Sequence, residues 1–187
     1  RSDVRDYYES DFGSVVLQQN PPLLTGAGQG YFALRSGLVV SRDRSLESRD
    51  PWSAFGDDPW RENPEVFEGT LTSAVAGFTA GWRGRRSDLI VDTDVEYAFP
   101  SPVRQDWGEL TFVQAIADAR WQMLALRNHT LEMRARAMQT FGPDPAPRQR
   151  WSLIGGPGTL PTLEQGELAG DNLAFLQTTY AIPLRVQ

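Results

Sequence analysis

Regular alternation between apolar and polar side chains is the feature that most limits how this chain can fold. In residues 89–99 an apolar residue or Thr93 occupies every second position, and Asp92, Asp94 and Glu96 lie between them. Successive side chains of a strand point to opposite faces, so a period of two predicts a strand with one acidic face. The pattern recurs less regularly in residues 31–40, 66–83, 131–141 and 173–184. We therefore expect an all-β, antiparallel fold.

Residues 110–126 fit two interpretations. They alternate like a strand, with Gln114, Asp118 and Arg120 on one face, but their alanine and leucine content also allows a helix. We favour a strand.

The chain divides into a short leading part and a long strand-rich part. Residues 1–28 are predicted to form an N-terminal segment and linker, with one short strand at residues 13–18. Residues 29–187 are predicted to hold the strands, with long loops at 41–64 and 143–171. The first of these loops contains Trp52 and Trp60, each after an Asp-Pro pair.

Strand length and charge distribution favour a membrane barrel over a soluble sheet. The expected strands are about 10 to 17 residues long, whereas strands in soluble proteins average about five or six. A wet barrel lumen tolerates charge on one face of a strand while the other face meets lipid. A soluble sheet with one solvated face would also alternate, but the strand lengths favour a transmembrane β-barrel, or part of one. The side chains expected to face its lumen are Asp92, Asp94, Glu96, Asp118, Arg120, Glu132, Arg134 and Arg136.

Composition excludes several other classes of protein. The net charge is −6, there is no Lys or Cys, and the 187 residues hold no apolar run long enough for a membrane helix. No basic cluster suited to nucleic acid is visible. The sole histidine is His129, and there is no Gly-x-Ser-x-Gly motif. We expect no enzyme activity, cofactor or metal.

Two further runs of residues have the composition of a binding site. The Gly26-Ala27-Gly28-Gln29-Gly30 run precedes a predicted strand, whereas a phosphate-binding loop precedes a helix. Asp92, Asp94 and Glu96 share a strand face and have a spacing workable for a cation. Neutralisation by arginines of adjacent strands is the interpretation we favour for these acids.

Residues 151–184 combine a strand end, a glycine-rich loop and a second alternating strand. Glycines supply backbone conformations that other residues avoid, so the loop is expected to follow a defined path. Its motif residues are Gly155, Gly156, Gly158, Thr159, Leu160, Gly166, Glu167, Gly170, Asp171 and Asn172.

The order of these motif residues resembles the bacterial surface antigen family of outer-membrane barrels. That family includes the BamA- and TamA-type assembly factors and the two-partner secretion transporters. The close resemblance covers about the last fifth of the chain. Where the family carries Arg-Gly-Tyr, this chain has Pro161-Thr162-Leu163, so the arginine that holds the family's loop inside the barrel is missing. The matching part stops before the closing strands of a family member, which predicts a piece of a larger barrel or a shortened relative.

The resemblance implies an outer-membrane protein that inserts or translocates other proteins. Its expected partners are outer-membrane lipid and unfolded or secreted client proteins, or other subunits of a membrane complex. The altered loop favours an alternative, a non-catalytic structural or accessory subunit. We also expect Glu164, Glu167 and Asp171 of the loop to meet Arg120, Arg134 or Arg136 of the wall in place of the missing arginine contact.

Overall fold

The computed structural model describes residues 8–21, 29–45, 66–102, 109–156, 159–160, 162–163 and 166–183. These residues form strands and two short 3-10 helices, with no α-helix among them. The elements are β1 (Tyr8–Gln19), β2 (Gln29–Ser45), β3 (Gly69–Arg83), β4 (Ser87–Pro102), β5 (Glu109–Leu124), η1 (Leu126–Asn128), β6 (Thr130–Phe141), η2 (Arg148–Arg150), β7 (Ser152–Ile154), β8 (Leu168–Gly170) and β9 (Leu173–Ala181).

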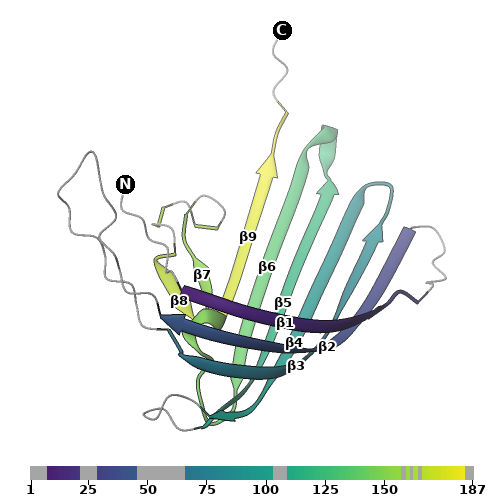
Figure 1. Ribbon diagram of the computed structural model, residues 1–187. Coiled ribbons are helices and arrows are strands. Elements are labelled where there is room, and N and C mark those ends of the chain that lie inside the picture. Colours follow the sequence, from purple (N-terminus) through teal and green to yellow (C-terminus); the bar gives the residue numbers. More distant parts are fainter. Residues whose placement is uncertain are drawn as a thin grey trace, which may run out of the picture.

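Seven strands form one antiparallel sheet in the order β1-β2-β3-β4-β5-β6-β9, and β7 pairs with β8 in a separate hairpin. Figure 1 shows the sheet curling into a trough, with β1 and β9 at its two edges. In the described part of the chain no pairing joins these two edge strands, so the sheet does not close into a barrel. The all-β antiparallel prediction is confirmed.

Most expected strands are confirmed. Alternation belongs to the sequence of each strand by itself, so it predicts the strand whatever residues it pairs with. Residues 110–126 lie almost entirely in β5, a strand rather than a helix. The strand expected at residues 13–18 is longer, since β1 pairs with β2 from Tyr8 to Gln19. Strand β2 extends to Ser45, which takes up the beginning of the loop expected at 41–64. The rest of that loop, with Trp52 and Trp60, lies outside the described residues.

The two ends of the trough differ in their connections. At one end, called here the turn rim, short turns join β3 to β4 and β5 to β6. The first is closed by the Gly84 amide, which donates to the Ser87 carbonyl at 2.8 Å. At the other end, the loop rim, longer connections join β2 to β3 and β6 to β9.

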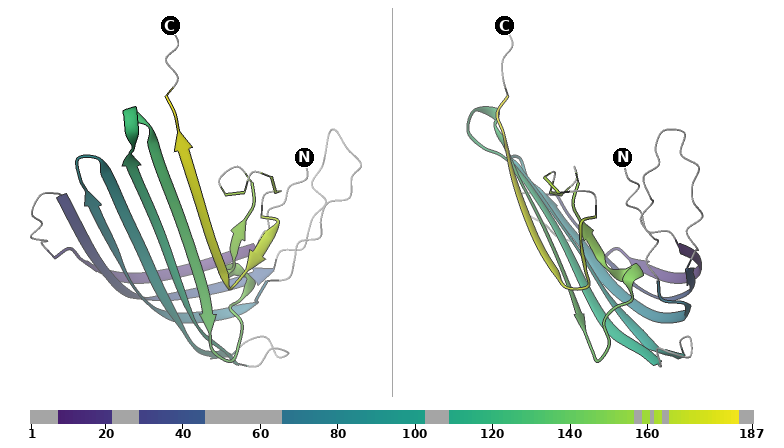
Figure 2. Two further views of the ribbon diagram at one scale, coloured as in Figure 1. Left: turned by 180° about the vertical axis from the view of Figure 1, so that it is seen from behind. Right: turned by 90° about the vertical axis from the view of Figure 1, so that its left-hand side faces the viewer.

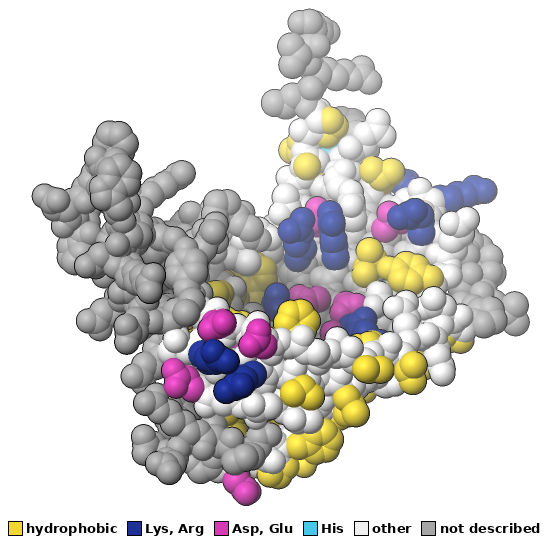
Figure 3. All heavy atoms as spheres, viewed as in Figure 1, with side chains coloured by type: hydrophobic (Ala, Val, Ile, Leu, Met, Phe, Trp, Pro, Cys, Tyr) yellow, Lys and Arg dark blue, Asp and Glu magenta, His cyan; other side chains and the backbone are white. Residues whose placement is uncertain are grey.

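Register and alternation divide the sheet into two chemically different faces. The concave face carries Arg35, Asp92, Asp118 and Arg134, which lie on four different strands. Figure 3 shows basic and acidic side chains gathered in the hollow. On the convex face exposed apolar side chains prevail, among them Leu38, Val95, Tyr97 and Leu176.

The connection between β6 and β9, residues 142–172, is called here the inner segment. It carries the β7–β8 hairpin and lies on the concave side of the sheet (Figure 2). The small core lies where it meets the loop rim. That core consists of Phe67, Leu71, Ala98, Leu110, Phe112 and Ala146.

Candidate functional site

The candidate site is the charged concave face together with the inner segment that lies on it. All eight acids and arginines predicted to face the lumen share this face. Their ion-pair partners differ in part from those expected, and Arg35 and Arg150 join the network from β2 and from the inner segment.

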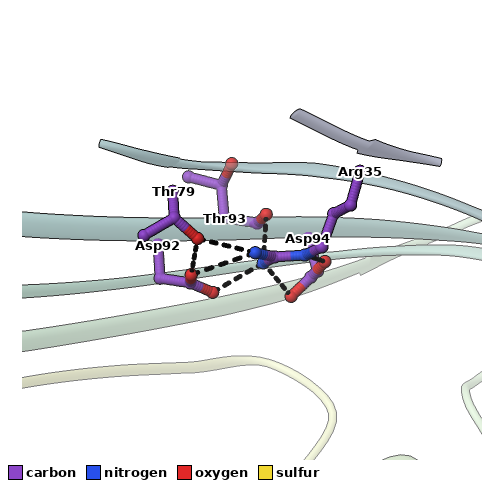
Figure 4. A network of polar contacts seen from close by, with 5 residues as sticks. All are labelled: Arg35, Thr79, Asp92, Thr93 and Asp94. Carbon is purple, nitrogen blue, oxygen red and sulfur yellow. Dashed lines mark hydrogen bonds and ion pairs between the residues drawn. The ribbon is translucent and has the colours of Figure 1, made fainter. Parts of the chain in front are cut away.

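Arg35 of β2 neutralises the acidic face of β4. Its guanidinium group binds Asp92 and Asp94 at 2.7 Å each. It also donates to the Thr79 hydroxyl at 2.7 Å and to the Thr93 carbonyl at 3.0 Å (Figure 4). A cation at these carboxylates would have to displace the guanidinium group, which already lies between the two aspartates.

Gly77 makes this contact possible. Strand β3 lies between β2 and β4, and Gly77 is the residue of β3 in register with both Arg35 and Asp94. A Cβ at Gly77 would clash with the Thr93 carbonyl oxygen and would lie 2.5 Å from Asp94 Oδ1 and 3.2 Å from Arg35 Nε. Arg35 thus crosses a whole strand through the space that a side chain on β3 would fill.

The charges of β5 and β6 pair mostly across the two strands. Arg136 lies 3.8 Å from Asp118, its directly opposite residue. Arg120 lies 3.3 Å from Glu132, which also accepts a hydrogen bond from Arg134 on its own strand. Asp118 thus pairs across the strands, whereas Glu132 pairs both across the strands and along its own strand.

Arg150 connects the inner segment to the wall. Its Nε donates to Glu96 Oε2 at 3.0 Å, and its Nη2 lies 3.3 Å from Oε1. It is the least exposed ion pair among the described residues of the concave face, with side-chain exposures of 25% for Arg150 and 16% for Glu96. The adjacent Gln149 donates to the Phe67 carbonyl at 2.8 Å, so η2 is held to the wall at two points.

Three glycines of the inner segment turn the chain, and local hydrogen bonds hold the described residues next to them. Gly155, Gly156 and Gly166 adopt positive φ angles of 133°, 88° and 71°, which residues with a Cβ rarely adopt. The Gly155 amide donates to the Thr159 hydroxyl at 2.8 Å, and the Gly156 amide donates to the Leu160 carbonyl at 3.0 Å. Gly158 lies outside the described residues.

The remaining motif residues guide the chain into β9. Glu167 is exposed and precedes β8, which ends at Gly170. The Asn172 side-chain oxygen accepts from the Thr140 amide at 3.1 Å. The Asp171 carbonyl accepts from the Thr140 hydroxyl at 3.0 Å, and its carboxylate accepts from the Ala146 amide at 3.3 Å.

The predicted contact between loop acids and wall arginines is therefore wrong for Asp171, whose carboxylate binds the Ala146 backbone of the inner segment itself. Glu164 lies outside the described residues. Arg120, Arg134 and Arg136 have partners within the sheet, and an electrostatic contact with the wall comes instead from Arg150.

The sequence interpretation missed Arg35, Gly77 and Arg150. A signal for Arg35 was present, since it is the only charged side chain of residues 31–40. Gly77 was visible as a glycine within a long alternating strand, where glycine often marks a close approach. Arg150 carried no comparable signal, because its partner is distant in sequence and lies across the trough.

A hollow of about 430 Å³ lies on the concave side near the turn rim. Its lining includes Tyr31, Arg83, Asp88, Arg120 and Gln122. The Tyr31 ring lies against Gly81, its partner on β3, where a Cβ would clash with it.

Comparison of the chain with protein-family models, curated proteins and solved structures finds no match. The family resemblance of the loop therefore stays a prediction. No helix in the described ranges is long and apolar enough to cross a membrane.

Proposed function

We propose that this chain forms part of the wall of a transmembrane β-barrel in a Gram-negative-type outer membrane. The observation that carries the proposal is an uncharged band on the convex face, called here the apolar band. It runs from the row of Trp82, Leu89 and Trp121, which are in register across β3, β4 and β5, to the level of Phe99 near the other end of β4. Among the described residues no Asp, Glu or Arg lies on the convex face between these rows.

The height of the apolar band matches a membrane. Leu89 and Phe99 are ten residues apart on β4, which at about 3.3 Å per residue corresponds to about 33 Å along the strand. A tilt of about 40° reduces this to about 25 Å, the height of the apolar band in outer-membrane barrels. The most polar side chains within it are Gln19 of β1 and Gln139 of β6, which carry no charge.

Aromatic and charged residues lie where the two membrane interfaces would be. Trp82 and Trp121 lie at the turn-rim end of the band, and Tyr97 and Phe99 at the loop-rim end. Aromatic girdles at both interfaces are typical of membrane barrels. In the described strands, convex charge begins beyond the band, where Arg42 lies opposite Asp11.

Protein insertion or translocation is the activity we propose for this wall. The support is the inner segment, which lies on the concave face and is fixed there by the Arg150–Glu96 ion pair. The resembled family places its conserved loop inside the barrel in the same way. No covalent chemistry or cofactor is part of this proposal.

A structural or accessory subunit is the second candidate. Strands β1 and β9 each pair on one side only within the described part of the chain, so strands of other subunits have an edge on which to complete a barrel. The replacement of Arg-Gly-Tyr by Pro161-Thr162-Leu163 also favours this candidate.

Photo-crosslinking tests the proposed activity. A photoreactive residue is placed at Val15 of β1 or Leu176 of β9, the outward-facing positions of the edge strands, and a matched control at Ala117 in the centre of the sheet. We expect adducts with unfolded client proteins at the edges and none at Ala117. Edge adducts that contain only fixed subunits of one complex would instead establish the accessory role.

The native mass of the chain, purified from outer membranes in mild detergent, tests the barrel itself. A compact band at monomer size that shifts on heating would mean that the chain closes a barrel alone. A band that runs only with other chains would favour the accessory subunit. A chain that partitions with soluble protein would contradict both.

A further inference from the structure

The β3–β4 turn at the turn rim is strongly basic. Arg83, Arg85 and Arg86 lie within four residues, and Asp88 is the one acid near them in sequence. Arg83 lies 3.5 Å from Asp88 on the concave side, so this pair is neutral. Arg85 and Arg86 are exposed and have no carboxylate partner among the described residues.

These two arginines lie beside the end of the apolar band. The Trp82 ring lies against Gly84 of the same turn, where its atoms Cζ2 and Cζ3 would be 2.9 Å from a Cβ. Trp121 shares the register row of Trp82. Arg86 Nη2 donates to the Ala125 carbonyl at 3.0 Å, which fixes this guanidinium group between the β3–β4 and β5–β6 turns.

At the loop rim, in contrast, the arginines of the convex face lie close to acids. Arg44 lies 3.7 Å from Glu9, and Arg42 is in register with Asp11. Acids of β1 thus neutralise the convex arginines at that end, whereas no acid in the described part of the chain neutralises Arg85 and Arg86 at the turn rim. Because of this difference in charge, we expect anionic groups of the lipid leaflet at the turn rim to lie close to Arg85 and Arg86.

We propose that Arg85 and Arg86, flanked by Trp82 and Trp121, bind the phosphate group of an anionic phospholipid in the leaflet at the turn rim. Guanidinium groups bind phosphate through two parallel hydrogen bonds, and tryptophan is favoured at the headgroup level. The inference rests on the proposed membrane function, since it needs the apolar band to lie in lipid.

Lipid retention measured by native mass spectrometry tests the site. The chain in detergent micelles is titrated with phosphatidylglycerol or with phosphatidylcholine. An arginine near an anionic lipid surface contributes about fivefold to binding, so two contribute about 25-fold. We therefore expect the R85Q/R86Q variant to retain about 25-fold less phosphatidylglycerol than the unmodified chain, with phosphatidylcholine unchanged.

The R42Q/R44Q variant is the matched control, because it removes the same charge from the other rim. It is expected to retain phosphatidylglycerol like the unmodified chain. A loss equal to that of R85Q/R86Q, or equal retention of both lipids by the unmodified chain, would overturn the site. Preferred retention of lipopolysaccharide through Arg85 and Arg86 would overturn the choice of phospholipid.

Two further measurements keep the inference separate from folding and from the proposed function. Raising the salt concentration on the unmodified chain must weaken its retention of phosphatidylglycerol, and retention that ignores salt would overturn the role of the arginines. Failure of the chain to insert into pure phosphatidylcholine vesicles would refute the proposed membrane function. Insertion with no lipid preference would refute the headgroup site alone.

Discussion

Replacing Gly77 with alanine is expected to break the charge network of the concave face. The new Cβ would occupy the space through which Arg35 reaches Asp94, and it would also clash with the Thr93 carbonyl. Either the guanidinium group must leave the two aspartates, or β3 must shift against β4. In the first case the ion pairs of Arg35 are lost, and in the second case backbone hydrogen bonds between β3 and β4 are lost.

The size of the effect follows from what Arg35 binds. Its five N–H groups make six hydrogen-bond contacts, because the two hydrogens of Nη2 are shared among three acceptors, and four of the six contacts are to carboxylates. Bonds to charged groups contribute about 1.5 to 3 kcal/mol each when buried. Asp92 and Asp94 are 40% and 47% exposed, however, so water screens most of this energy. We expect the whole network to contribute about 2 to 3 kcal/mol, a change of about 30- to 160-fold in the folding equilibrium.

Denaturant titration of the chain in detergent, followed by tryptophan fluorescence, measures the change in the free energy of unfolding. Gly13→Ala in β1 is the matched control, since a Cβ at Gly13 would meet nothing within 4 Å. The control is expected to raise the free energy of unfolding by about 0.5 kcal/mol, because glycine within a strand has an entropic cost.

A double-mutant cycle separates the network from the backbone clash. If Gly77→Ala expels Arg35, then adding Arg35→Met to Gly77→Ala lowers stability by far less than Arg35→Met does alone. Additive losses would refute the reasoning, because they would mean that Arg35 keeps its partners in the alanine variant. Equal stability of Gly77→Ala and Gly13→Ala would also refute it.

Three other perturbations test the remaining parts of the structure. Ala117→Arg, at mid-height of the apolar band, is expected to destabilise the chain in lipid vesicles by about 2 to 4 kcal/mol. Gln122→Arg, on the concave face of the same strand, should be near neutral. Equal refolding yields of the two variants would contradict the membrane orientation. Glu96→Arg should expose the inner segment to protease, and the added Arg150→Glu should restore protection; protection that is unaffected by Glu96→Arg would mean that the ion pair does not hold the segment. Asn172→Ala removes the acceptor of the Thr140 amide and is expected to cost about 1 kcal/mol, with faster hydrogen exchange in β9; exchange unchanged from the parent chain would show that the turn does not secure this strand.

The strands were predictable from sequence because alternation needs no knowledge of partners. Strand β4 is the clearest case, since each of its acids lies on the concave face as its spacing requires. The extent of β1 was less predictable. Its acidic start, with Glu9 and Asp11, resembles a linker until the register sets those acids opposite Arg44 and Arg42.

Ion-pair partners depended on register, which the sequence alone does not specify. Residues two apart on a strand are about 7 Å apart, whereas directly opposite residues approach to about 5 Å. Asp118 accordingly pairs with Arg136 across the strands rather than with Arg120 on its own strand. Glu132 lies within reach of Arg134 on its own strand and of Arg120 on β5, since the arginine side chain is long enough for either route.

The resulting network constrains what the concave face can do. Ion pairs among the described residues of this face join six acids to six arginines: Asp88, Asp92, Asp94, Glu96, Asp118 and Glu132 with Arg35, Arg83, Arg120, Arg134, Arg136 and Arg150. Selectivity for ions of one sign needs a ring of like charges, and these pairs instead cancel within each part of the wall. A balanced wall of this kind is suited to hold a polypeptide segment through local pairs. Arg150 of the inner segment binds Glu96 in this way, and the client chain that we propose would make the same kind of contact through mixed charges of its own.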